Sequence, residues 1–156
     1  MITRKMKFAS LMVVCLMSTV FFSCKDDKDE PKKDGVAIEV AGSYSGDMVS
    51  TVMGQTFNFY DLTFVVTAED EDDVTITIPE YEYMNMQFPE IIVKDVDVSE
   101  SNGVYEFETT EFSGTFESGT AYSGHIGGTL SNKTLTLNIA YNIGAMPPMV
   151  CVFISK

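Results

Sequence analysis

Residues 36–156 alternate between apolar and polar positions in the way that is typical of β-strands. The clearest stretch is 134–143, where leucine, isoleucine and tyrosine alternate with threonine, asparagine and alanine. Successive side chains of a strand point to opposite faces, so this pattern predicts a strand with one face in the core. Residues 120–131 alternate in the same way, and the segment 131–133 between the two stretches predicts a tight hairpin.

The same pattern predicts eight strands and no helix after residue 36. Apolar positions change phase near Pro79, near Met84 and between Phe107 and Phe112, which indicates the bulges or bends that a small barrel needs in order to curve. Antiparallel strands with short links close most economically into an up-and-down barrel, filled by side chains or holding one small ligand. The predicted strands of this all-β, eight-stranded antiparallel barrel are 38–53, 56–68, 74–83, 90–98, 103–116, 120–131, 134–143 and 149–155.

The first 23 residues have the layout of a bacterial export signal. Basic residues stand near the start, and an apolar run of about 15 residues follows, which is too short to span a bilayer comfortably. Cys24 comes directly after this run, and the motif Phe21-Phe22-Ser23-Cys24 resembles the lipobox of bacterial lipoproteins. The resemblance implies that the mature chain is exported and anchored in a membrane by acyl chains on Cys24.

A short charged segment separates this cysteine from the strands. Residues 24–35 contain lysines and acidic residues and almost no apolar side chain, which predicts a flexible acidic linker between the signal (1–23) and a barrel domain (36–156). Lys25-Asp26-Asp27 resembles the tag that directs some Gram-negative lipoproteins to the cell surface. We therefore predict an outer-membrane lipoprotein, with surface exposure left open.

Charge and cysteine content exclude one class of function and one way of stabilising the fold. Removal of residues 1–23 takes away Arg4, Lys5 and Lys7, so 7 basic residues remain against 23 acidic ones and the net charge moves from −13 to −16. Nucleic-acid binding needs a basic surface, and this balance excludes it. Cys151 is the one cysteine left beside Cys24, so no disulfide within the domain is available and core packing must hold the fold.

Three segments carry a resemblance to a known family. The opening segment 40–46 (Val-Ala-Gly-Ser-Tyr-Ser-Gly), the middle segment 86–91 (Met-Gln-Phe-Pro-Glu-Ile) and the hairpin of Gly127-Gly128-Thr129-Leu130 with 135–137 are similar to the calycin-like β-barrel domain of bacterial lipoproteins. This resemblance covers roughly residues 38–156 and implies a lipocalin-like fold, in a family without a settled activity.

Strand parity sorts the predicted turns into two ends of the barrel. The chain enters at an end with the acidic turns 69–73 and 99–102, together with 131–133. The opposite end collects turns that are strongly apolar for loop sequence and hold five of the six methionines of the mature chain. Because the anchor precedes the acidic end, this methionine-rich end should point away from the membrane. Its candidate binding residues are Met53, Met84, Met86, Phe88, Met146 and Met149.

Two interpretations of these methionines stay open. Methionine adapts to varied partners, and exposed apolar loops mark contact sites, so this end could hold an apolar small ligand or a partner segment. Alternatively the methionines fold inward as core filler, and the protein is an accessory surface lipoprotein that docks a partner through its outer barrel wall. A barrel lumen of roughly 300 Å³ or more under these loops would favour the first interpretation, in which a ligand is bound.

Enzymatic and metal chemistry find little support in the sequence. One histidine, His125, and no Gly-X-Ser-X-Gly motif do not make a catalytic triad, so we predict a non-enzymatic protein without a cofactor. The spacings Met84-X-Met86 and Met146-X-X-Met149, near Cys151, could offer sulfur ligands to Cu(I), but no histidine accompanies them. A structural role for these residues is the preferred interpretation, and no metal site is predicted.

Overall fold

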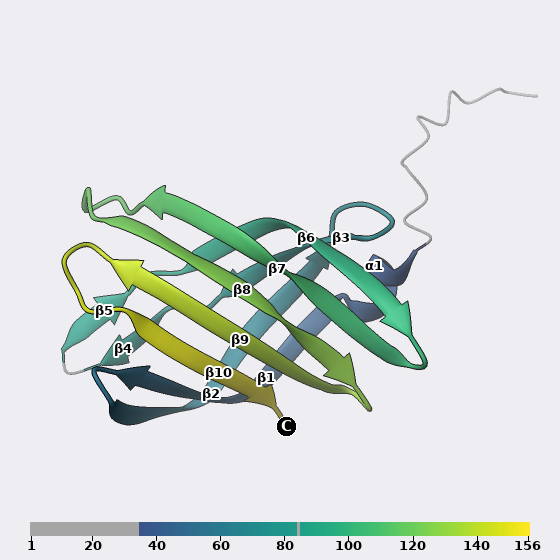
Figure 1. Cartoon of the computed structure of the whole chain (residues 1–156), viewed down its shortest axis with the longest axis horizontal. Helices are drawn as coiled ribbons and strands as arrows, with labels where there is room; N and C mark the ends of the chain where they lie inside the picture. Colours follow the sequence, from purple (N-terminus) through teal and green to yellow (C-terminus); the bar gives the residue numbers. More distant parts are fainter. Residues whose placement is uncertain (1–34, 84) are drawn as a thin grey trace, which may run out of the picture. The chain divides into compact units, whose positions relative to one another are not determined.

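The computed structural model describes residues 35–83 and 85–156, and in it eight strands form one closed antiparallel barrel (Figure 1). Each barrel strand pairs with the barrel strands that precede and follow it, and the first strand pairs with the last. This order confirms the predicted all-β up-and-down barrel. The barrel strands are β1 (Gly42–Val52), β2 (Gln55–Ala68), β3 (Asp73–Ile78), β6 (Ile91–Ser101), β7 (Val104–Thr115), β8 (Ala121–Ser131), β9 (Thr134–Ile143) and β10 (Met149–Ser155).

The start of the first strand was predicted wrongly. Residues 36–40 form a short helix, α1 (Val36–Val40), and β1 begins only at Gly42. Ala37 and Val40, three positions apart, are fully buried, and the Ala37 amide donates to the carbonyl of Glu71 (3.1 Å). The helix therefore fills the end of the barrel where the chain enters, which a strand could not do. No helix in the part of the chain that the structure describes is long and apolar enough to cross a bilayer.

The third predicted strand, 74–83, is two strands. β3 ends at Ile78, and after Pro79 the chain continues as β4 (Tyr81–Tyr83), which pairs with β5 (Met86–Phe88) in a separate two-stranded sheet. Proline lacks the amide that a ladder needs, so the regular pairing stops there. The predicted phase changes near Pro79 and Met84 thus mark a strand break and a hairpin.

Side chains fill the interior of the barrel. Phe64, Phe107 and Phe153 are at most 2% exposed, and the Phe64 and Phe153 rings lie 4.2 Å apart between centroids. Around them pack inward-facing apolar side chains of all eight barrel strands. The core is therefore side-chain-filled, one of the two forms expected of an eight-stranded barrel.

Three bulges bend the barrel wall. Between Phe107 and Thr110 two residues of β7 face one of β8, which confirms the predicted irregularity in this stretch. The other two bulges, at Asp61 in β2 and Asp95 in β6, have positive φ values of 55° and 56° and were not predicted. Asparagine and aspartate tolerate this left-handed conformation better than branched residues do.

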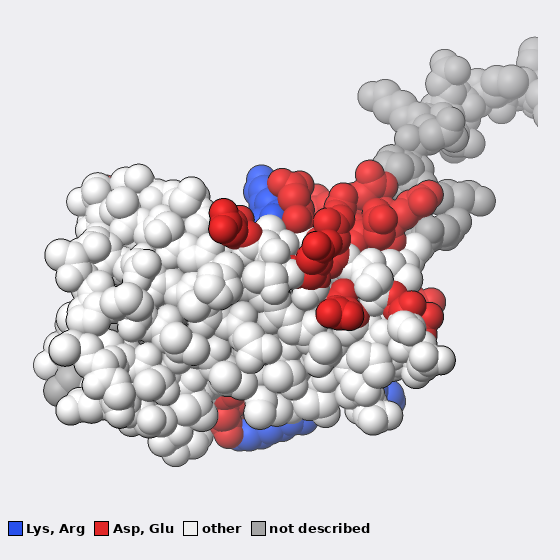
Figure 2. All heavy atoms as spheres, in the orientation of Figure 1, with Lys and Arg blue, Asp and Glu red and all other residues white. Residues whose placement is uncertain are grey.

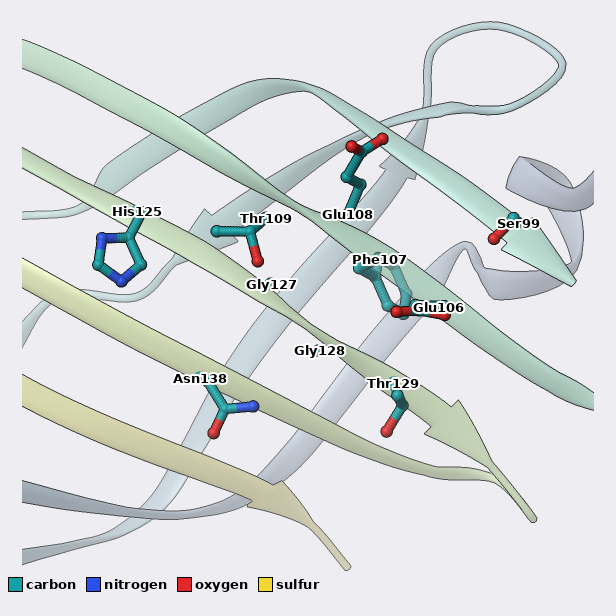
Figure 3. A pocket seen from close by; sticks show the side chains of 10 residues that line it. All are labelled: Ser99, Glu106, Phe107, Glu108, Thr109, His125, Gly127, Gly128, Thr129 and Asn138. Carbon is teal, nitrogen blue, oxygen red and sulfur yellow. The ribbon is translucent and has the colours of Figure 1, made fainter.

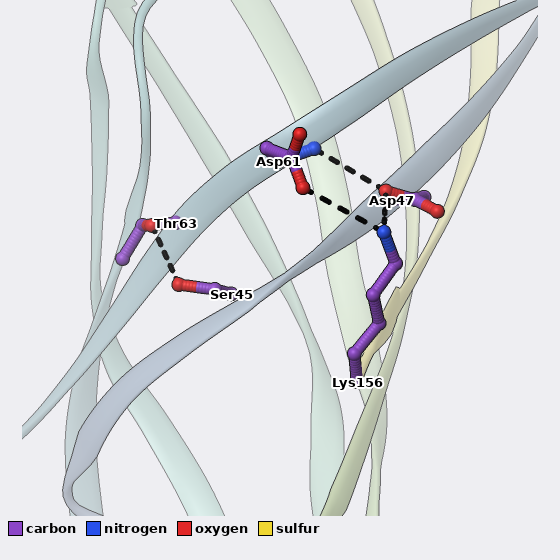
Figure 4. A network of polar contacts seen from close by, with 5 residues as sticks. All are labelled: Ser45, Asp47, Asp61, Thr63 and Lys156. Carbon is purple, nitrogen blue, oxygen red and sulfur yellow. Dashed lines mark hydrogen bonds and ion pairs between the residues drawn. The ribbon is translucent and has the colours of Figure 1, made fainter.

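Charged side chains surround the bulge at Asp61 (Figure 4). The Asp61 amide donates to the Asp47 carboxylate (3.2 Å), and Lys156 Nζ lies 2.8 Å from the same carboxylate and 3.6 Å from that of Asp61. The hydrogen bond from Lys156 lowers the pKa of Asp47. These groups are solvated, so the cluster mainly fixes the last residue of the chain against β1 and β2 rather than adding much stability.

Two aspartates face each other directly across β3 and β6, and we expect their repulsion to be measurable. A hydrogen bond shared with Asp97 raises the pKa of Asp73. A raised carboxyl pKa gives stability at low pH that is lost as the pH rises through it. We therefore expect Asp97→Asn to raise the melting temperature at pH 7, with a gain that shrinks below pH 4. Thermal melts between pH 3 and pH 7 test this expectation, with Glu80→Gln as a control that removes the same charge. Equal melting temperatures of Asp97→Asn and the wild type at pH 7 would contradict it.

Candidate functional site

The strand order places the turns at two ends, as parity predicted. We call the end with α1 and the turns 69–72, 102–103 and 132–133 the acidic end, and the opposite end the methionine end. The methionine end carries the β1–β2 turn, the β4–β5 hairpin, the β7–β8 turn and the loop 144–148. On the face shown in Figure 2, acidic side chains gather toward the acidic end and the methionine end is almost uncharged.

A pocket of about 380 Å³ opens at the methionine end, and five of the six predicted binding residues line it. Met53 is 82% exposed and Met86 43%, whereas Phe88 and Met149 are almost fully buried and form its deeper wall. The structure thus brings these residues together. The five are Met53, Met86, Phe88, Met146 and Met149; Met84 lies outside the described residues.

Aromatic packing holds the hairpin against β2 beside this pocket. The Tyr81 ring stacks on Phe88, with centroids 4.7 Å apart, and also packs against the Phe59 ring at 4.8 Å. Tyr83 packs on Phe57 at 4.5 Å. Such ring pairs stabilise contacts beyond the area that they bury. The hairpin therefore forms one wall of the pocket and β2 another.

The sequence did not identify several lining residues. Val52 ends β1, Gln55 and Phe57 belong to β2, and Tyr83 and Pro147 complete the wall. The first three flank Met53 in the chain, so a search for apolar residues next to the predicted turn would have found Val52 and Phe57. Tyr83 could have been predicted as a lining residue only if the break of the strand after β3 had been known.

Two tyrosine hydroxyls behind the pocket wall have no hydrogen-bond partner. Tyr81 is 7% exposed and stacks on Phe88, and Tyr141 is 3% exposed and pairs with Met149 across β9 and β10. Burial raises the pKa of Tyr81, so its hydroxyl stays protonated. With both rings in the core, neither is available at the surface for stacking on a ligand.

Cys151 is a structural residue. It is fully buried, and its thiol donates to the Ser50 hydroxyl (3.2 Å). Burial raises the pKa of the thiol, and only a thiolate is a good nucleophile or metal ligand. Within residues 35–83 and 85–156, no group of three or more histidine, cysteine, aspartate and glutamate side chains could hold a metal ion.

A hollow of about 710 Å³, larger than the apolar pocket, lies on the outer wall and not at the methionine end (Figure 3). It crosses β7, β8 and β9 at the bulge, where Gly127 faces Thr109; a Cβ on Gly127 would lie 2.8 Å from Thr109 Oγ1. The surrounding polar side chains point in different directions, and the one aromatic residue, Phe107, is buried. The bulge and the glycines explain this hollow, so the smaller apolar pocket is the stronger candidate site.

The predicted signal 1–23, Cys24 and the first eleven residues (24–34) of the predicted linker 24–35 lie outside the described residues, so their roles remain predictions.

Comparison with known proteins agrees with the fold. Residues 40–153 match the family described as the calycin-like beta-barrel domain, and no curated protein matches the sequence. The structure is similar to the crystal structure of a "putative outer membrane protein" from Bacteroides fragilis, with a TM-score of 0.67 and 20% sequence identity over 77% of this chain and 52% of that chain. This chain therefore spans about half the length of that structure, and the likeness shows a shared fold. With its closed barrel and a family match over most of its length, the chain belongs to the calycin-like β-barrel domain family.

Proposed function

We propose that this protein is a lipid-anchored, exported binding protein that holds an apolar small ligand in the pocket at the methionine end. The observation that carries the proposal is an open apolar pocket of about 380 Å³ above a core that side chains fill. Calycin-like barrels are in general binding folds. The pocket volume falls within the range of small-molecule sites.

The filled core decides where a ligand can sit. Met48, Phe64 and Phe153 are fully buried in the core of the barrel, so the ligand binds at the mouth instead of inside the lumen. Unbranched methionine side chains can repack around ligands of different shape. Met53 is largely exposed, so ligand binding would remove its apolar surface from water.

We expect a charge placed in the pocket to weaken binding of a neutral apolar probe. The probe is N-phenyl-1-naphthylamine, measured by fluorescence with the chain from residue 24 carrying Cys24→Ala, so that no acyl chain competes. Met53→Asp should weaken binding about tenfold or more, because an apolar ligand cannot compensate a desolvated carboxylate. Val150→Asp, at a position 54% exposed on the outer wall, is the control and should bind as the wild type does. Equal binding by both variants would refute the site.

The anchor and the location are a second part of the proposal. The lipobox-like motif that ends in Cys24 and the name of the similar Bacteroides protein support an outer-membrane lipoprotein. Cells labelled with an alkyne fatty acid should tag the wild-type protein, and Cys24→Ala should remove the tag completely, since no other residue in the motif can carry the acyl chains. Tagging of the substituted protein would show that the motif was misread.

We also propose that the protein is not an enzyme. The Cys151 thiol is buried and protonated, and His125 lies exposed on the outer wall, away from it. Neither arrangement supplies an activated nucleophile.

The part of the outer wall that β8, β9 and β10 form has no acidic residue, and this supports the alternative, in which the barrel docks a surface partner. No acidic residue follows Glu117, and Val49, Val150 and Ile154 are 40–54% exposed on neighbouring strands β1 and β10. Under this alternative, the apolar probe finds no site. Val150→Asp then weakens cross-linking of the protein to its complex in intact cells, and Met53→Asp does not.

A further inference from the structure

Two further pockets continue the apolar pocket along the rim of the methionine end. The nearer, of about 110 Å³, shares Met86, Phe88 and Met146 with it. The farther, of about 440 Å³, shares Phe116 and Ser118 with the nearer one. Neighbouring pockets share lining residues, so the three follow one another along the rim. Together we call them the rim groove.

The far part of the rim groove exists because two barrel strands separate. β6 and β7 pair only over Val98–Ser101 and Val104–Phe107, near the acidic end. Toward the methionine end they diverge (Figure 1), and residues 91–97 of β6 have no strand partner on that side. The far pocket lies in this seam, between the start of β6 and the β7–β8 turn.

The chemistry of the groove changes along its length. The far pocket is lined by the paired rings of Phe116 and Tyr122, with centroids 4.5 Å apart, and by the exposed residues Glu90 and Glu117. Gly114 makes room for one ring, since a Cβ there would lie 2.4 Å from the Tyr122 hydroxyl. No lysine, arginine or histidine lines any of the three pockets.

We propose that the rim groove binds an amphiphile with an apolar chain and a cationic alkylammonium head. The chain lies among the methionines, and the head lies at Phe116 and Tyr122, whose faces attract quaternary ammonium groups. Glu90 and Glu117 add attraction for a cation and repel the carboxylate of a fatty acid. This inference rests on the proposed function and specifies its ligand class.

Three probes with the same chain length test the inference by calorimetry. Dodecyltrimethylammonium, 1-dodecanol and dodecanoate are each titrated below micelle formation into the chain from residue 24 carrying Cys24→Ala. We expect the cation to bind about tenfold more tightly than the alcohol, and dodecanoate more weakly than both, with the preference falling as salt is added. Equal binding of all three overturns the cationic head and leaves the proposed function standing. No binding of any probe, the alcohol included, overturns both.

Matched variants distinguish attraction of the cation by the glutamates of the rim groove from attraction by the net negative charge of the protein. Glu90→Gln/Glu117→Gln should reduce the affinity for the cation toward that for the alcohol, which should be unchanged. Glu106→Gln/Glu108→Gln makes the same charge change on the outer wall and should keep the preference. Phe116→Leu keeps the apolar contact and should lose part of the preference, because it removes one aromatic face. An equal loss in the outer-wall variant would show that net charge selects the cation, which overturns the proposal.

Discussion

Replacement of Phe153 by alanine is expected to lower the free energy of unfolding by about 3–5 kcal/mol. Phe153 is fully buried, packs on the Phe64 ring at 4.2 Å, and faces Met48 and Leu137 on the adjoining strands. No neighbour can fill the cavity without breaking the barrel pairing. Because small domains are stable by only about 5–15 kcal/mol, the loss would be a large fraction of the total.

Urea denaturation followed by circular dichroism measures this loss, and the adjacent residue is the control. Ile154 points outward and is 50% exposed, so Ile154→Ala should change stability by less than about 1 kcal/mol. If Phe153→Ala fails to fold, Phe153→Leu should fold with a smaller loss, since most of the volume remains. Similar losses for Ile154→Ala and Phe153→Ala would contradict the assignment of inner and outer faces.

The pair Phe153 and Ile154 shows why the barrel itself could be predicted. Strand side chains alternate with a period of two, so the sequence pattern reports directly which face each residue of β9 and β10 occupies. Short turns leave few ways to connect such strands, and the antiparallel meander then fixes which loops meet. The gathering of Met53, Met86 and Met146 at one end followed from this parity alone.

Features that depend on contacts between distant segments were not predictable in this way. The segment Val36–Val40 is rich in β-branched residues and would suit a strand, yet it forms a helix because Ala37 and Val40 fill the barrel end. The phase change near Pro79 indicated a bulge or bend, but the pattern alone did not show that the strand breaks there into β3 and β4. The divergence of β6 and β7, which creates the far pocket, involves residues that look like ordinary strand positions.

In the candidate site, too, some features followed from strand alternation and others depended on contacts between distant segments. Sequence parity placed the methionines, but the aromatic contacts that shape the pocket depend on how the β4–β5 hairpin folds back onto β2. Tyr81 and Glu82 are neighbours in a strand of three residues, and only the tertiary contact decides that Tyr81 is buried against Phe59.

The second large effect is expected from Phe88→Ala, which should loosen the hairpin and abolish binding of the neutral apolar probe. Phe88 is 4% exposed and stacks on Tyr81. It lines both the apolar pocket of about 380 Å³ and the adjoining pocket of about 110 Å³. Truncation of a buried phenylalanine typically costs about 3–5 kcal/mol. The hairpin pairs with no barrel strand, so the loss should be concentrated at residues 81–88 and leave the barrel closed.

Hydrogen exchange with peptide resolution, together with the probe titration, tests this expectation. Residues 81–88 should lose protection while β9 and β10 keep theirs, and the probe should no longer bind. Glu82→Gln, at an exposed position of the facing strand β4, should change neither measurement. Unchanged protection of the hairpin in Phe88→Ala would mean that the Tyr81 stack does not hold it. Loss of protection with intact probe binding would mean that the hairpin is not a wall of the binding site, and the pocket would then consist of the β1–β2 turn and the loop 144–148 alone.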